Sequence, residues 1–238
     1  MVSNGRARML LGGGFGYAIG SFPTADLVAK YVSRRNGHAQ AIDLRQTGTK
    51  NPGALNAAKV LGAKWGLLIL VGDALKGLFA CLAGRRIASD DGAYVAGIGA
   101  VVGHCLPVTA GFRGGKGLAT SVGTSIVCFP AYMPIDLALA AASTALSRGQ
   151  AGKATYFASA VFTGAALYWH RAHKGNLWGP PATKWLPLYA ASTSAIIAYK
   201  FLIAPALPVD AAVADASTGA PPTDQRAGLD DTEDAIVS

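Results

Sequence analysis

The segment Phe112-Arg113-Gly114-Gly115-Lys116-Gly117 combines three glycines and two cations between two apolar stretches. Glycine lets backbone N–H groups approach a ligand closely, and successive N–H groups in a tight turn form an anion-binding concavity. A helix that begins at Leu118 would add its positive end to the same field. The segment therefore predicts a phosphate site, whose expected ligands are Lys116 and the backbone of Gly114, Gly115 and Gly117.

A second polar segment, residues 33–60, is too long and too rich in special residues for a simple connector. Long ordered loops in compact proteins tend to be functional, although a solvated basic loop is the alternative. The segment carries cations, a hydroxyl and an amide that could bind a second phosphate: Arg45, Lys59, Thr49 and Asn51.

The composition is that of a membrane protein. The 238 residues are 51% hydrophobic and only 14% charged, with a mean hydropathy of +0.33, whereas soluble domains carry about 25% charged residues. The net charge is +8, which suits anionic headgroups or phosphorylated substrates. Nucleic acid is not an expected partner, because the basic residues are dispersed between apolar stretches.

Three isolated cysteines, Cys81, Cys105 and Cys128, imply neither a disulfide nor zinc.

The apolar stretches predict an all-α, polytopic membrane protein with about seven transmembrane helices. They lie at about 9–32, 61–83, 92–111, 118–130, 132–147, 154–169 and 185–204, after a polar lead of residues 1–8 and with a polar loop at 84–91. Residues 1–205 form the expected membrane domain. Residues 206–238 are rich in Ala, Pro, Asp and Thr, which predicts a disordered acidic tail.

The distribution of Lys and Arg between the loops predicts that the N-terminus lies outside the cell. This orientation places the segments 33–60 and 111–117 together on the cytoplasmic side, as active-site loops that could hold two phosphates. It places the polar loop 170–184 on the outer side. Two histidines three apart in that loop have no accompanying carboxylate or cysteine, so no metal is expected.

Ionisable residues within the apolar stretches need partners. Asp26 either faces protein or water, or lies at the membrane interface near the end of the first stretch. Asp73 and Lys76 are three apart and share one helix face, so an ion pair is the favoured interpretation. His104 precedes the glycine-rich segment, and it is either an interface residue or a supporting residue of the phosphate site.

Three segments resemble the bacterial membrane-bound glycerol-3-phosphate acyltransferases that use acyl phosphate as donor. The stretch GSFPTADL at 20–27 resembles the G-S-I-P-x-A-Y-L of that family, and DLRQTGTKNPGALNAAK at 43–59 resembles D-x-R-x-x-G-S-x-N-P-G-A-T-N-x-x-R. The stretch GHCLPVTAGFRGGKGLAT at 103–120 resembles G-H-x-F-P-V-x-x-x-F-x-G-G-K-G-V-A-T. Together with Gly72–Gly77, the resemblance covers residues 16–124, about half of the chain.

The resemblance implies transfer of an acyl group from acyl phosphate to glycerol 3-phosphate, which gives lysophosphatidate in the first step of phospholipid synthesis. It implies a multi-pass enzyme of the bacterial inner membrane that needs no cofactor, and we expect a monomer. The catalytic residues that it implies are Thr49, Lys59 and Lys116. The substrate-binding residues that it implies are Arg45, Asn51, Gly53, Asn56, His104, Gly114, Gly115, Gly117, His173 and Asn176.

The chain departs from the family at three places. Thr49 stands for a serine and keeps the hydroxyl, whereas Lys59 stands for an arginine and loses the bidentate phosphate fork. The stretch His173-Lys174-Gly175-Asn176-Leu177 fits the third motif of the family, H-x-x-N-I, but it comes before the last apolar stretch instead of after it. This displacement leaves open an acyltransferase with another acceptor, or a non-catalytic protein that binds lipid or phosphate.

The chemistry of an acyl phosphate is itself undemanding. Its carbonyl is already activated, so the enzyme mainly holds two anions close together and aligns an alcohol with the carbonyl carbon, while cations stabilise the developing oxyanion. No Ser-His-Asp arrangement is visible in either loop, which favours direct attack without an acyl-enzyme. A small transporter is a further alternative, but no pair of equivalent broken helices supports it. The spacing Gly-Gly-Lys-Gly does not fit a Walker ATPase.

Overall fold

The computed structural model describes residues 2–37, 39–146 and 151–204, and all regular elements among them are helices. These are α1 (Val2–Gly20), α2 (Thr24–Arg35), α3 (Ala54–Leu61), α4 (Ala63–Cys105), α5 (Leu118–Cys128), α6 (Met133–Leu146), α7 (Ala151–Arg171) and α8 (Trp185–Leu202), with a 3-10 turn η1 (Val108–Ala110). The all-α prediction is confirmed. The predicted acidic tail, 206–238, lies outside the described residues.

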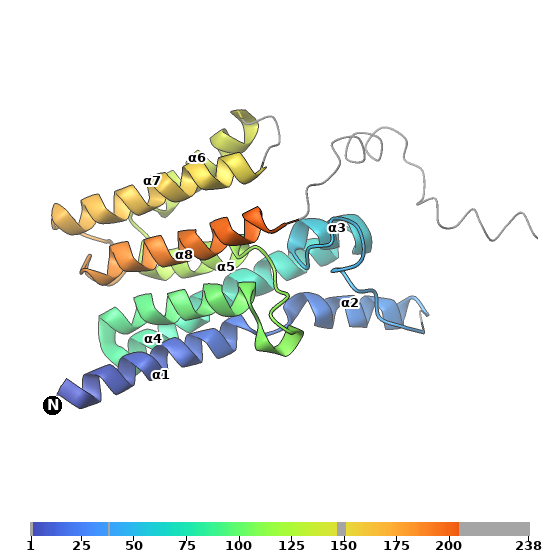
Figure 1. Cartoon of the computed structure of the whole chain (residues 1–238), viewed down its shortest axis with the longest axis horizontal. Coiled ribbons are helices and arrows are strands. Elements are labelled where there is room, and N and C mark those ends of the chain that lie inside the picture. The colour runs from blue at the N-terminus through green and yellow to red at the C-terminus, as the bar shows by residue number, and fades with distance from the viewer. Residues whose placement is uncertain (1, 38, 147–150, 205–238) are drawn as a thin grey trace, which may run out of the picture. The chain divides into compact units, whose positions relative to one another are not determined.

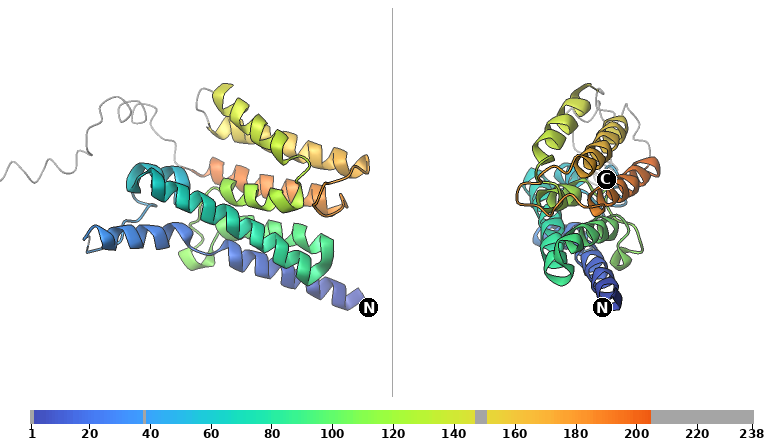
Figure 2. Two further views of the ribbon diagram at one scale, coloured as in Figure 1. Left: turned by 180° about the vertical axis from the view of Figure 1, so that it is seen from behind. Right: turned by 90° about the vertical axis from the view of Figure 1, so that its left-hand side faces the viewer.

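The helices pack around α4 (Figure 1). Helix α1 lies along one side of α4, α5 and α8 contact it elsewhere, and α6 and α7 lie farther out, with α7 against α8. Figure 2 shows the same order from behind. An apolar cluster that includes Cys81, Tyr94, Phe129 and Tyr189 joins α4, α5 and α8 and is closed by Phe162 of α7.

Helix α4 consists of two antiparallel halves. The backbone turns back at Ala88 (φ −133°, ψ 33°) and Ser89 (φ 59°, ψ −160°). The reversal lies within the predicted polar loop, 84–91, but the residues on both sides of it remain helical, so the connection is tighter than predicted. A Cβ atom at Gly84 would overlap the carbonyl of Gly92, so the absence of a side chain lets the two halves meet this closely beside the reversal.

The first predicted span, 9–32, is divided into α1 and α2 by Pro23, which lacks a backbone N–H and lies at φ −85°, ψ 61°. Helix α1 begins at Val2 and therefore includes most of the predicted polar lead, residues 1–8. The break leaves carbonyl groups free for side chains of other segments. Thr109 Oγ1 donates to the carbonyl of Ser21 over 2.9 Å, and Lys76 Nζ donates to that of Phe22 over 3.3 Å.

Within the described ranges, one stretch, Ala63–Ala110, is long and apolar enough to cross a membrane by length and composition. The shorter helix α5 and the first part of α6 are also apolar. The predicted spans 118–130, 132–147, 154–169 and 185–204 overlap α5, α6, α7 and α8. The number of crossings and their orientation stay predictions.

A second apolar cluster holds the polar segment after α2 in place. Ala25 and Ala29 of α2, Leu44, Ala57 of α3 and Ile69 of α4 pack together. Leu44 is 1% exposed although it lies in an irregular segment. This single anchor fixes the neighbouring Arg45 against the helices.

Candidate active site

A small cavity of about 30 Å³ lies where three segments far apart in the sequence meet. These are the break between α1 and α2, the Arg45 loop (residues 39–53) and the glycine-rich turn (residues 111–117), with α4 beneath them. The polar and glycine residues around the cavity are Asp26, Arg45, Asp73, Lys76, His104, Gly114 and Gly115. The structure thus brings together Arg45, His104, Gly114 and Gly115 of the predicted substrate-binding residues.

The Arg45 loop is held in shape by Asn56, which is 1% exposed. The Asn56 side chain donates to the carbonyls of Leu44 (2.9 Å) and Thr47 (3.0 Å) and accepts from the backbone N–H of Thr49 (2.6 Å). Both N–H donors of this buried amide and its carbonyl oxygen are engaged by the loop, which holds the side chain in one orientation. Asn56 thus shapes the Arg45 loop, and its contact with a substrate stays a prediction.

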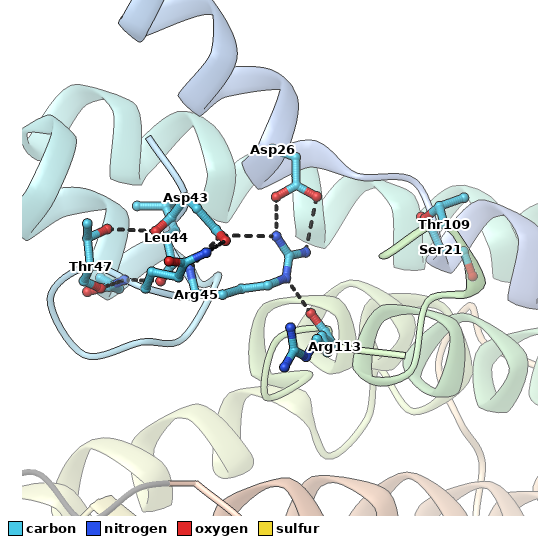
Figure 3. A network of polar contacts seen from close by, with 10 residues as sticks. Ser21, Asp26, Asp43, Leu44, Arg45, Thr47, Thr109 and Arg113 are labelled. Carbon is cyan, nitrogen blue, oxygen red and sulfur yellow. Dashed lines mark hydrogen bonds and ion pairs between the residues drawn. The ribbon is translucent and has the colours of Figure 1, made fainter. Parts of the chain in front are cut away.

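Each nitrogen of the Arg45 guanidinium donates a hydrogen bond to a protein group (Figure 3). Its two terminal nitrogens pair with the Asp26 carboxylate, Nη1 with Oδ1 over 2.5 Å and Nη2 with Oδ2 over 3.1 Å. Its Nε donates to the carbonyl of Arg113 over 2.7 Å, and Asp43 Oδ1 lies 3.7 Å from Nη1. Arg45 thereby ties the Arg45 loop to α2 and to the glycine-rich turn.

The charges in this network stabilise one another. The hydrogen bond to Asp26 raises the pKa of Arg45 above its usual value, although burial acts in the opposite direction. Burial alone would raise the pKa of Asp43, but hydrogen bonds from the Arg45 backbone N–H and from Gln46 outweigh it and lower this pKa. The bidentate geometry between Arg45 and Asp26 is the arrangement in which guanidinium–carboxylate pairs are strongest.

Asp73, Lys76 and His104 form a buried polar group below the cavity. Lys76 Nζ lies 2.8 Å from Asp73 Oδ1, and His104 Nδ1 lies 3.7 Å from the same oxygen. All three residues are at most 8% exposed. The predicted ion pair between Asp73 and Lys76 is confirmed, and His104 takes the supporting position beside the glycine-rich turn.

The glycine-rich turn packs directly onto His104. The N–H of Gly114 donates to the carbonyl of Cys105 over 3.2 Å, and a Cβ atom at Gly115 would overlap His104 Nε2. Gly117 lies at φ +88° and precedes the first residue of α5, Leu118, where the helix was predicted to begin. Any larger residue at Gly115 would push the turn away from His104.

Lys116 follows Gly115 but does not line the cavity. Its ammonium lies over the ring of Phe201, 4.3 Å from the ring centroid. Burial lowers the pKa of Lys116 below its ordinary value. Within the part of the chain that the structure describes, no carboxylate forms an ion pair with it.

The remaining residues of the Arg45 loop and α3 lie outside the cavity. Pro52 is part of its wall, whereas Thr49, Asn51, Gly53 and Lys59 are not. Lys59 is exposed on α3, and Thr49 is half-buried. Gly53 N–H donates to the carbonyl of Asn51 over 2.8 Å, which closes the turn before α3. These four residues lie near Pro52 along the chain but do not line the cavity.

The structure does not bring His173 and Asn176 to the cavity. Asn176 is 5% exposed and donates to the carbonyls of Cys128 (2.9 Å) and Pro180 (2.7 Å). Its loop packs beside the reversal of α4, where Arg85 donates to the carbonyl of Trp178 over 3.3 Å. Figure 1 shows the connection between α7 and α8 at the end of the bundle near the N-terminus, opposite α2 and α3. Asn176 is a structural tie of that end, and His173 is exposed there.

Two residues with a place in this region were not among the predicted site residues. Asp26 was singled out as needing a partner, but its partner Arg45 lies 19 residues away in the sequence. Lys200 is 9% exposed near the end of α8. The signal for Lys200 was present, because an ionisable residue within an apolar helix is by default a candidate for a functional site.

Comparison with known proteins gives one consistent family. A family model described as glycerol-3-phosphate acyltransferase matches residues 10–203. A glycerol-3-phosphate acyltransferase of Alkaliphilus metalliredigens is 40% identical over 114 residues, which is 48% of this chain and 55% of the relative. Relatives of the same name from Exiguobacterium sibiricum and Desulforudis audaxviator are 46% and 38% identical over 48% and 57% of this chain. The matched stretches span 52% and 65% of these two relatives, so the chain covers less than two thirds of each.

Two solved structures are similar over most of the chain. The crystal structure of PlsY (YgiH), an integral membrane glycerol 3-phosphate acyltransferase, in its glycerol 3-phosphate form has a TM-score of 0.64 and 26% identity, and the match covers 89% of this chain and 92% of that one. Its lysophosphatidic acid form has a TM-score of 0.63 and 25% identity. The helical arrangement described above is therefore that of an integral membrane protein.

Proposed function

The chain belongs to the glycerol-3-phosphate acyltransferase family, and from that premise we propose that it transfers an acyl group from acyl phosphate to glycerol 3-phosphate, releasing lysophosphatidate. The observation that carries the proposal is the cavity at which Arg45, His104 and the glycine-rich turn converge. The related crystal structures are named for glycerol 3-phosphate and for lysophosphatidic acid, the acceptor and the product of such a transfer.

In this proposal the two phosphates occupy neighbouring positions. The cavity between Arg45 and His104 takes the phosphate of glycerol 3-phosphate, and Lys116 with the backbone of Gly115 and Gly117 takes that of the acyl donor. Thr49, Asn51, Gly53 and Lys59 are assigned to the rim where the anions enter, and an exposed lysine suits that role because it attracts them electrostatically. Of the expected catalytic residues, Lys116 lies beside the donor phosphate in this proposal, whereas Thr49 and Lys59 act at the rim.

The acyl chain has a separate place in the proposal. An apolar pocket of about 220 Å³ lies between α5, α6, α7 and α8, and Leu118 and Ile197 line it. Leu118 directly follows the glycine-rich turn. A donor whose phosphate is bound at that turn would extend its chain into this pocket, which removes apolar surface from water.

The proposed reaction is a direct displacement. The hydroxyl oxygen of glycerol 3-phosphate attacks the carbonyl carbon of the acyl phosphate, an ester bond forms, and the bond from that carbon to the phosphate oxygen breaks. The hydroxyl proton passes to the departing phosphate, so no protein base and no acyl-enzyme are needed. The cations around the carbonyl stabilise the negative charge on its oxygen in the transition state.

The cavity must open for this reaction. Its volume of about 30 Å³ suits about one water molecule, and Asp26 occupies the phosphate-binding fork of Arg45. We assign the first step of binding to the replacement of the Asp26 carboxylate by the substrate phosphate. In the proposed topology this step takes place at the cytoplasmic face of a multi-pass protein of the bacterial inner membrane.

A second candidate function is binding of a lipid or phosphate without transfer. The position of His173 and Asn176 far from the cavity favours it, because the third motif of the family then contributes nothing to the site. An acyltransferase with a different acceptor fits the same observation.

A transfer assay separates these candidates. Purified full-length protein is incubated with labelled glycerol 3-phosphate and palmitoyl phosphate, and lysophosphatidate is measured. We expect turnover by the wild type and loss of most of it in Lys116→Ala. Absence of turnover with acyl phosphate, acyl-CoA or acyl carrier protein as donor, while glycerol 3-phosphate still binds, would establish the binding protein instead.

A further inference from the structure

The end of α8 carries a buried cation that none of the predicted roles includes. Lys200 is only 9% exposed. In the described ranges of the chain no carboxylate forms an ion pair with it, whereas Asp26 and Asp43 pair with Arg45 and Asp73 pairs with Lys76. Taking an ammonium out of water without a counter-charge is unfavourable. An unpaired buried lysine therefore requires an explanation.

The face of α8 that carries Lys200 is turned toward the glycine-rich turn. Ile197 and Lys200 are three apart and share a helix face. Ile197 packs with Val101 and Cys105 of α4, and a Cβ atom at Gly117 would touch both Cys105 and Ile197. Phe201, the residue after Lys200, lies under the Lys116 ammonium.

The surroundings of the Lys200 ammonium are cationic. The positive charge of Arg45 acts on Lys200, and the charges of Lys76 and Lys200 act on His104. Among the described residues, Arg45 and Lys76 have carboxylate partners and Lys200 has none. A site with one uncompensated positive charge is completed by an anion.

We propose that Lys200 is a further substrate-binding residue, which binds the phosphate group of one of the two substrates from the α8 side of the site. The inference rests on the proposed function and adds α8 to the elements that build the site. The loop of His173 and Asn176 lies at the opposite end of the bundle and contributes no residue to the site. Lys200 supplies a cation from the last helix instead. The phosphate belongs either to glycerol 3-phosphate or to the acyl phosphate, and the two share the chemistry that a buried ammonium recognises.

A purely structural role is the competing explanation. Lys200 lies in the last turn of α8, where the negative end of the helix dipole stabilises a cation. This effect changes the folding equilibrium by less than about 10-fold. Its methylene groups also cover apolar surface. In that case substitution would change the stability of the protein and leave substrate affinity unaltered.

The test compares Lys200→Met, which keeps the length of the side chain, with Lys200→Arg, which restores the charge. Lys184→Met is the matched control, since Lys184 is exposed and directly precedes α8 at its other end. The full-length proteins are purified in nanodiscs, and KM is measured separately for glycerol 3-phosphate and for palmitoyl phosphate. Protection from thermal unfolding by inorganic phosphate is measured in parallel.

We expect Lys200→Met to raise one of the two KM values about 10-fold or more, as for loss of a hydrogen bond to a charged group. The substrate whose KM rises identifies the phosphate. Lys200→Arg should regain most of the affinity, and Lys184→Met should behave as the wild type. Phosphate protection should be weakened in Lys200→Met alone.

Unchanged KM values and unchanged phosphate protection in Lys200→Met would overturn the proposal, with or without a change in melting temperature. If Lys200→Met does not fold, Lys200→Gln is measured in the same way. The proposed function is judged by the wild type. Absence of turnover there refutes the acyl transfer, while phosphate protection with and without Lys200 still decides whether this lysine binds phosphate.

Discussion

Arg45, in the loop before α3, and Lys200, near the end of α8, lie close enough for their charges to interact, and they differ in how these charges are compensated. Arg45 has a bidentate carboxylate partner, a second carboxylate at 3.7 Å and a carbonyl acceptor. Lys200 has no carboxylate partner among the described residues. Protein carboxylates thus compensate the charge of Arg45. In our proposal, the phosphate of a substrate compensates the charge of Lys200.

The electrostatic reason is the cost of desolvation. A buried charge loses its hydration and must regain that free energy from a partner. Asp26 already provides such a partner for Arg45, so a substrate phosphate that replaces it gains only the difference between a phosphate and a carboxylate. A phosphate that binds to Lys200 replaces no carboxylate and gains the full interaction.

The largest expected effect is that of Arg45→Ala on catalysis. The change removes the proposed phosphate fork and leaves Asp26 and Asp43 without their partner, so kcat/KM for glycerol 3-phosphate should fall about 100-fold, as for about 3 kcal/mol. Arg113→Ala is the control, because only the backbone carbonyl of Arg113 contacts Arg45. An equal fall in kcat/KM in the two variants would mean that the net positive charge of the region matters, rather than the bidentate contact of Arg45 with the phosphate.

The next prediction compares how much the Arg45 loop and Lys200 each contribute to the free energy of unfolding. Asn56→Ala removes three hydrogen bonds that shape the Arg45 loop and leaves buried backbone groups unpaired, which should lower the free energy of unfolding by about 1–3 kcal/mol. Thermal unfolding in detergent measures this. Lys200→Met should lower it much less, and a larger loss in Lys200→Met would reverse the comparison.

Asp26→Asn tests whether the carboxylate competes with the substrate. Without its charge the fork of Arg45 becomes more accessible, and KM for glycerol 3-phosphate should fall up to about 10-fold, since one charge-assisted hydrogen bond is worth about 1.4 kcal/mol or more. Asp26→Glu keeps the charge and serves as the control. A rise in KM in Asp26→Asn would show instead that Asp26 orients Arg45 for binding.

The smallest effect concerns the dependence of stability on pH. Because the folded protein holds the pKa of Asp43 below its ordinary value, Asp43 contributes stability that is fully present above its unfolded pKa of about 3.9 and is lost as the pH falls through the lowered folded value. Urea unfolding of the wild type and of Asp43→Asn is compared between about pH 6 and about pH 3, a range that spans these pKa values. The free energy of unfolding of the variant should fall less on acidification. Parallel curves would exclude this contribution.

The sequence was a good guide wherever the signal was local. The helical spans after residue 118, the start of α5 at Leu118 and the pair of Asp73 and Lys76 all follow from spacing along one helix or from a glycine that precedes it. The connection between the spans 61–83 and 92–111 was predicted at the right place, but its helical character was not, because Gly84-Arg85-Arg86 and Asp90-Asp91 have the polarity of a loop. Pro23 itself indicated the division of the first span, but the apolar residues on both sides of it favoured one continuous span over 9–32.

The sequence by itself determined the all-α class, the family and the two polar segments that carry the cations, since these depend on composition and on residues near one another in the chain. Only the tertiary structure decided which of those cations are free to bind a substrate. Asp26 neutralises Arg45, which lies 19 residues away in the sequence. Asn56 forms its hydrogen bonds with the loop that it stabilises. Lys200 is a buried cation near the end of the last helix. Charge compensation depends on distances in space and on burial, and neither can be read from the order of the residues.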